Sequence, residues 1–175
     1  MKILFVVLLL CASSLAQSVA SAPAVAPGCG GANVKFDVKT NKSHHPIAQP
    51  ESGKAIVYFV EDDNGFESFP KPTTRVGLDG GWVGANHGDS YFYFSVDPGE
   101  HHLCASWQSL VIIGAQETTA AAHFTAEAGQ AYYFRVKNVW LRDHGHGHVE
   151  LLPLDNDEGQ LLASRFALST SHPKQ

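Results

Sequence analysis

Short runs of alternating apolar and polar residues, bounded by Gly, Pro, Asn and Asp, make up the chain from Lys54 onward. Alternate residues of a strand point to opposite faces, so a period of two predicts half-buried β-strands. The pattern predicts strands at 54–60, 73–79, 81–86, 90–97, 100–108, 118–126, 131–139 and 148–154. The expected fold class is all-β: a single antiparallel β-sandwich of about seven to eight strands, with a short C-terminal helix and an extended N-terminal arm.

Two turn sequences support this pattern. Asp79-Gly80-Gly81 tolerates the positive φ angles of a tight hairpin, and Pro98-Gly99 suits the centre of a type II turn. We therefore expect consecutive strands, joined by these turns, between Arg75 and Ala105.

The alternation also predicts which side chains face the core. Phe92, Phe94 and Val96 share one side of their strand. The other residues expected to face inward are Leu103, Ala105, Trp107, Ala122, Phe124, Tyr132, Phe134 and Val136. Cys104 points away from Leu103, so we expect it on an outer face that the N-terminal arm covers.

The pattern changes after the last predicted strand. Leu161, Leu162 and Phe166 have the spacing of an apolar helical stripe, and Asp155 and Glu158 have the spacing of a capping box. This indicates a short helix. The sandwich domain is predicted over 53–168, followed by a tail at 169–175.

Residues 1–16 have the composition of a cleaved secretory signal peptide, with Lys2, an apolar run and small residues up to Ala16. The run is shorter than the roughly 20 residues that cross a bilayer. We therefore expect an exported protein, periplasmic or extracellular, without a transmembrane segment. Leu10 before Cys11 departs from a lipoprotein signal and argues against a lipid anchor.

Residues 17–52 are rich in Ala, Pro, Gly, Ser and Asn and predict an extended low-complexity arm, in which Val34, Phe36 and Val38 alternate as in a short strand. Removal of the signal leaves two cysteines, Cys29 and Cys104. In an oxidising compartment such a pair favours a disulfide, worth about 4 kcal/mol on the chain-entropy model. The alternative is two free thiols.

Charge and motifs narrow the function classes. The net charge is -5 without any cluster of Lys or Arg, which argues against nucleic acid and anionic lipid as partners. The sequence contains no G-x-S-x-G elbow of a hydrolase, no H-E-x-x-H motif of a zinc protease, no P-loop and no glycine pattern of a dinucleotide-binding site. Paired carboxylates could come from Glu61, Asp62, Asp63 and Glu67, but these fall on a presumed polar loop with solvated side chains. We expect no enzymatic activity.

Ten histidines are an unusual number for this length. His144, His146 and His148 alternate with glycines, so in an extended chain they share one face at about 7 Å per step. Three imidazoles suit zinc or copper, which makes a periplasmic metal-binding protein the alternative function. The competing interpretation is a hydrophilic hairpin tip with solvated histidines and no cofactor.

Five segments carry a family resemblance: GKAIVYFV at 53–60, LDGGWVG at 78–84, SYFYFSVDPGEHHL at 90–103, FTAEAGQAYYFRV at 124–136 and LLPLDNDEGQLLA at 151–163. In this order they resemble the bacterial secreted family catalogued as domain of unknown function 2846. The DGxxVG and VxPGxH pieces also resemble PEGA-type β modules. The resemblance implies a small β-sandwich of the bacterial envelope and supplies no catalytic residues.

Aromatic residues exceed what one core face needs, and four of them are candidate binding residues: Trp82, Tyr91, Tyr93 and Trp140. Flat rings serve both sugar stacking and protein contacts. The leading hypothesis is a non-catalytic exported envelope module that binds a partner protein or cell-wall glycan through an exposed sheet face. The alternative is that the sandwich and its arm enclose all four rings.

Overall fold

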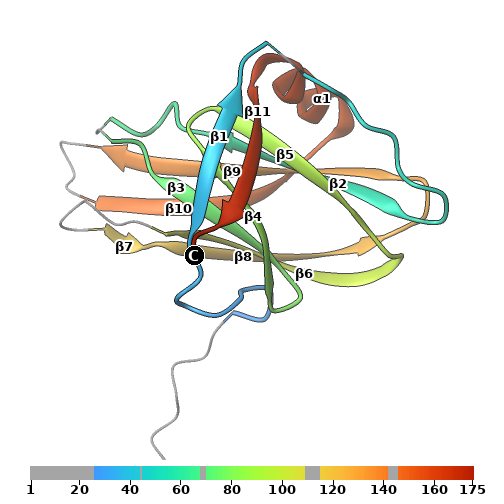
Figure 1. The fold of residues 1–175 in the computed structure, drawn as a ribbon, viewed down its shortest axis with the longest axis horizontal. Coiled ribbons are helices and arrows are strands. Elements are labelled where there is room, and N and C mark those ends of the chain that lie inside the picture. Colours follow the sequence, from blue (N-terminus) through green and yellow to red (C-terminus); the bar gives the residue numbers. More distant parts are fainter. Residues whose placement is uncertain (1–25, 44, 68–69, 109–114, 142–145) are drawn as a thin grey trace, which may run out of the picture.

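The computed structural model describes residues 26–175 except residue 44 and the segments 68–69, 109–114 and 142–145. In this part of the chain, seven strands form one sheet in the order β1-β11-β5-β2-β9-β10-β7, and four form a second sheet in the order β4-β3-β6-β8 (Figure 1). The strands are β1 (Phe36–Asn41), β2 (Ala55–Asp62), β3 (Thr73–Leu78), β4 (Gly81–His87), β5 (Ser90–Val96), β6 (Gly99–Trp107), β7 (Ala115–Glu117), β8 (Thr119–Ala126), β9 (Ala131–Leu141), β10 (His146–Leu154) and β11 (Ala167–Pro173). The all-β class is confirmed, but the strands outnumber the seven to eight expected.

All eight predicted strands are present as β2–β6 and β8–β10. The additional strands come from segments without a clear pattern. β1 lies in the predicted arm and pairs with β11, which occupies most of the predicted tail at 169–175. The tail prediction is therefore wrong up to Pro173. The purely antiparallel prediction also needs correction, because β2 pairs with β9, β11 with β5 and β10 with β7 in parallel.

The large sheet is buried on both faces around β2. Val57 and Phe59 face the small sheet, whereas Ile56, Tyr58 and Val60 form a second apolar cluster on the outer face. That outer cluster is covered by α1 (Asn156–Arg165) and by residues near Ala48. A strand buried on both faces needs a continuous apolar run, which the sequence AIVYFV supplies.

The predicted inward faces are confirmed. Between the sheets lie Phe92, Val96, Leu103, Ala105, Trp107, Phe134 and Val136, with Phe94, Ala122, Phe124 and Tyr132 packed against them. Alternation therefore identified the core correctly on every strand for which it was used.

The first predicted turn has the expected backbone, since Asp79 and Gly80 have φ angles of 48° and 86°. At the second, Gly99 has a positive φ of 140°, which differs from the roughly 80° of a type II turn, so that turn type is not confirmed. One ring nitrogen of His101 lies 2.7 Å from an Asp79 carboxylate oxygen, and the other lies 2.7 Å from the Asp97 carbonyl. His101 thus packs between the two turns.

A disulfide joins Cys29 to Cys104, with the two Cα atoms 5.1 Å apart. It holds residues 26–34, here called the strap, against the outer face of the small sheet. The approach is close: a Cβ atom added to Gly77 would lie 2.4 Å from the Gly28 carbonyl oxygen. The cysteine pairing and the outer position of Cys104 are both confirmed.

The predicted helix is α1, at one end of the large sheet (Figure 1). Asp155 caps it by accepting a hydrogen bond of 2.8 Å from the Glu158 backbone N–H. The helix packs tightly on β9, since a Cβ atom at Gly159 would meet the Tyr133 ring at 2.2 Å. None of the helices in the described residues has the length and apolar character needed to span a membrane.

Candidate functional site

The four aromatic residues proposed for binding do not share one exposed face. Tyr91 is completely buried and Trp140 is 9% exposed, while Tyr93 and Trp82 are half-buried. Tyr91 and Tyr93 belong to the outer cluster of the large sheet, Trp140 lies between the sheets, and Trp82 lies beneath the strap.

The N-terminal arm encloses part of this set. The Tyr91 hydroxyl donates to the Pro46 carbonyl at 3.0 Å, and the neighbouring Tyr58 hydroxyl donates to the Ala48 carbonyl at 2.9 Å. The Trp82 indole N–H donates to the Gly31 carbonyl at 2.7 Å. A sheet face built from these rings is therefore occupied by the protein's own arm.

The histidine hypothesis falls largely outside the described residues. His144 lies in the segment 142–145, and His146 is described only by its backbone pairing with Leu141 in β10. His148 is partly exposed, and its Nε2 lies 3.0 Å from a Glu150 carboxylate oxygen. Within the described residues, no group of three or more His, Cys, Asp and Glu side chains could hold a metal ion. Metal binding by these histidines stays a prediction.

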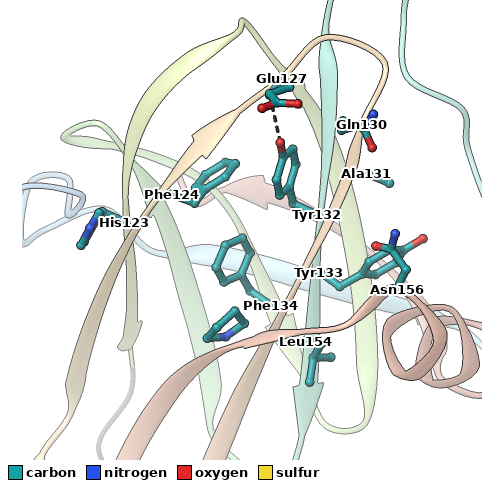
Figure 2. A pocket seen from close by; sticks show the side chains of 11 residues that line it. His123, Phe124, Glu127, Gln130, Ala131, Tyr132, Tyr133, Phe134, Leu154 and Asn156 are labelled. Atoms are coloured by element: carbon teal, nitrogen blue, oxygen red, sulfur yellow. Dashed lines mark hydrogen bonds between the residues drawn. The ribbon is translucent and has the colours of Figure 1, made fainter.

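A groove of about 380 Å³ opens at one end of the sandwich, between the edge of the small sheet and β10 (Figure 2). Its lining comes from β8, β9, β10 and the start of α1: His123, Phe124, Glu127, Gln130, Ala131, Tyr132, Tyr133, Phe134, Pro153, Leu154 and Asn156. None of the candidate residues named from the sequence as binding or metal-ligating residues lines this groove.

The groove exists because the two sheets do not join along this seam. In the described residues, β8 pairs only with β6, and β10 beyond His148 pairs only with β9. Pro153 has no backbone N–H to donate, which suits it to the open edge of β10. Two unpaired strand edges therefore face each other across the groove.

Aromatic rings form the groove's floor. The ring centroid of Phe124 lies 5.0 Å from that of Tyr132 and 5.2 Å from that of Phe134, with the planes tilted by 55° and 62°. The Tyr132 hydroxyl accepts a hydrogen bond of 3.0 Å from the Glu127 backbone N–H, which fixes the ring (Figure 2). Phe124 and Tyr132 are partly exposed at the groove, whereas Phe134 is only 3% exposed and supports them from the core.

Polar side chains surround this floor. Figure 2 shows Glu127 and Gln130 at the rim near Tyr132, and Asn156 beside Tyr133 near the helix. Glu127 and Gln130 are exposed. A carboxylate accepts hydrogen bonds, while an amide both donates and accepts them. The groove can therefore hold a ligand with apolar faces and hydroxyl groups.

A second polar region lies inside the sandwich. Glu61 is completely buried and Asp63 is 2% exposed, so their interpretation as solvated loop carboxylates is wrong. The Asn138 side-chain amide donates to Glu61 at 2.9 Å and to Asp63 at 2.6 Å. Its oxygen accepts the Trp107 indole N–H at 2.6 Å. We call these four residues the acidic core.

The burial of Glu61 could have been expected from the sequence. Glu61 continues the alternation of Val57 and Phe59, so the period of two places its side chain on the same inward face.

Burial governs the acid–base behaviour of the acidic core. It raises the pKa of Glu61 well above its usual value, and the neighbouring charge of Asp63 raises it further. Burial also raises the pKa of Asp63, to about 6, while the bond from Asn138 works in the opposite direction. Both carboxyls contact the same amide nitrogen, so their negative charges repel each other. Protonation of one of them removes this repulsion.

No protein-family model matches the chain, and a search of curated proteins gives no match. The resemblance to the envelope family of unknown function therefore stays a prediction, and functional inference depends on the sites described above.

Proposed function

We propose that this protein is a non-catalytic exported module that binds a cell-wall glycan in the groove between β8 and β10. The observation that carries the proposal is the juxtaposition of an aromatic floor, formed by Phe124 and Tyr132 with Phe134 beneath them, with the polar rim of Glu127 and Gln130.

The chemistry of sugars matches this arrangement. One face of a sugar ring presents C–H groups that pack on aromatic rings, and its edge presents hydroxyls that pair with carboxylate and amide groups. The groove's volume, about 380 Å³, falls within the range of roughly 300–1,000 Å³ found for small-ligand sites. A protein partner is less favoured, because the exposed sheet face it needed is covered by the arm.

Export is supported by two independent features. The Cys29–Cys104 disulfide belongs to an oxidising compartment, where such bonds persist. The first sixteen residues have the composition of a secretory signal. Both fit a protein that meets glycans outside the cytoplasm.

Calorimetric titration of the oxidised mature protein with an oligomer of N-acetylglucosamine tests the proposal. We expect saturable binding that weakens about fivefold in Gln130→Ala, the loss that corresponds to one hydrogen bond of about 1 kcal/mol. Gln160→Ala changes another exposed glutamine, on α1, and is expected to bind normally. A second pair of variants at exposed positions works in the same way. Glu127→Gln changes the groove and should weaken binding, whereas Glu100→Gln lies outside the groove and should bind normally.

Two results would overturn the proposal. One is the lack of saturable heat with both the oligomer and purified peptidoglycan. The other is glycan binding that the Gln130 and Glu127 variants leave unchanged. Retention of an envelope protein without any glycan binding would favour the protein-partner hypothesis instead.

A further inference from the structure

Arg75 is a buried cation on the outer face of the small sheet. It lies in β3, opposite Ser106 of β6, and is only 8% exposed. The strap covers it, and its guanidinium carbon lies 4.3 Å from the centroid of the Trp82 ring. This region lies away from the glycan groove, whose lining it does not share.

The guanidinium uses only one of its edges fully. Its Nη1 donates to the strap carbonyls of Ala32, at 2.9 Å, and Val34, at 2.7 Å. Its Nη2 makes a long contact of 3.4 Å to the Ser106 hydroxyl. Its Nε is enclosed by the protein and has no hydrogen-bond partner among the described residues, so Nη2 is the nitrogen left to donate to a ligand.

Arg75 also has no counterion among the residues that the structure describes, because none of their carboxylates forms an ion pair with it. Burial lowers the pKa of Arg75, but a guanidinium stays protonated at any physiological pH. A buried charge without a partner is costly, and an anion would remove that cost.

A pocket of about 310 Å³ lies beside this group and can admit an anion. Its polar side chains are Arg75, Ser106 and Thr119, and its walls include Trp82 and the strap around Cys29. The Thr119 hydroxyl donates to the Ser106 hydroxyl at 3.1 Å, so the two groups lie side by side as further hydrogen-bonding partners.

We infer that this pocket binds a small molecule through its carboxylate group. The carboxylate accepts a hydrogen bond from Nη2 of Arg75, its charge balances the guanidinium, and the hydroxyls of Ser106 and Thr119 are positioned to contact the rest of the ligand. A single carboxylate fits better than a phosphate, because Arg75 supplies one positive charge to the pocket.

Titration of the oxidised, full mature protein with acetate at constant ionic strength tests this inference, with chloride as the reference and inorganic phosphate as the competing anion. We expect saturable acetate binding and a higher unfolding temperature in acetate than in chloride. Arg75→Lys keeps the charge but removes the Nη2 donor, so acetate should bind at least tenfold more weakly. Thr119→Val should weaken binding about threefold, whereas Thr125→Val, an exposed position on the same strand, should not.

The variants also keep the test decisive if Arg75→Lys fails to fold, because Thr119 is exposed and its replacement leaves the charge in place. Equal unfolding temperatures and heats in acetate and chloride would overturn the inference. So would acetate binding that the Thr119 variant does not weaken, or binding of phosphate without binding of acetate.

Discussion

The two sheets each bury ionisable side chains, but they do so in opposite ways. The acidic core lies between the sheets, where Asn138 contacts both Glu61 and Asp63. Arg75 lies outside the small sheet, where the strap supplies two carbonyl oxygens. The first region encloses carboxyl groups in an apolar core. The second encloses a guanidinium beneath the strap, which the disulfide fastens to the sheet.

The difference follows from what each group can do when it loses water. A carboxyl can bind a proton, so burial appears as a raised pKa and the group loses its charge. A guanidinium has no such option at physiological pH, so its charge needs acceptors or an anion. The acidic core is therefore expected to respond to pH, and the Arg75 region to anions and to the state of the disulfide.

The largest expected effect comes from removing the amide at the centre of the acidic core. Asn138→Ala leaves the Trp107 indole and both carboxyls without their shared partner, which should lower the free energy of unfolding by about 4 kcal/mol. Urea denaturation measures the loss. Asn64→Ala, at an exposed position, serves as the control, and a loss as small as that of the control would show that Asn138 does not hold the network together.

The next effect tests the strap. Cys29→Ser should lower the free energy of unfolding by about 3 kcal/mol, because the strap is no longer held against Arg75 and Cys104. The double variant with Cys104→Ser should lose no more than the single one if the bond is responsible. Mass spectrometry of the denatured, unreduced protein must show no alkylatable cysteine; two labelled thiols would rule out the disulfide.

The pH dependence distinguishes the two regions directly. The folded pKa of Asp63, about 6, exceeds the usual value of 3.8, so the folded protein keeps a proton that the unfolded chain releases. The free energy of unfolding should therefore fall by up to about 3 kcal/mol as the pH rises from about 4 to 6. The raised pKa of Glu61 acts in the same direction.

Denaturation at several pH values between 4 and 7 measures this slope. Asp63→Asn should make it shallower and leave only the part that Glu61 contributes, whereas the neighbouring variant Asp62→Asn should leave it unchanged. Arg75→Lys should also leave it unchanged, because the arginine does not titrate in this range. An undiminished slope in Asp63→Asn would place the responsible group elsewhere.

The smallest effect concerns the histidines, which belong to neither region. The metal hypothesis predicts that zinc stabilises the protein by about 1.4 kcal/mol at a tenfold excess over its Kd. That gain should disappear when His144, His146 and His148 are all replaced by Ala, and should persist in His172→Ala. Equal stabilisation of the wild-type and triple-variant proteins would exclude these histidines as ligands.

The sequence alone determined the features that depend on neighbouring residues. Period-two alternation located β2–β6 and β8–β10 and their inward faces, because adjacent side chains on a strand necessarily point to opposite sides. Asp155 identified the start of α1, because a cap acts on backbone groups only a few residues away. The pair of cysteines that remains once the signal is excluded favoured the disulfide, and the structure decided between that bond and two free thiols.

Tertiary structure decided what depends on residues distant in the chain. β1 and β11 have weak patterns of their own and are strands because they pair with each other across more than a hundred residues. Tyr91 is buried because the arm folds back over it, and Asp63 is buried because Asn138, 75 residues later, meets it between the sheets. The groove, likewise, exists only where the edges of β8 and β10 fail to pair, since an unpaired edge is a property of the assembled sheets and not of either strand's sequence.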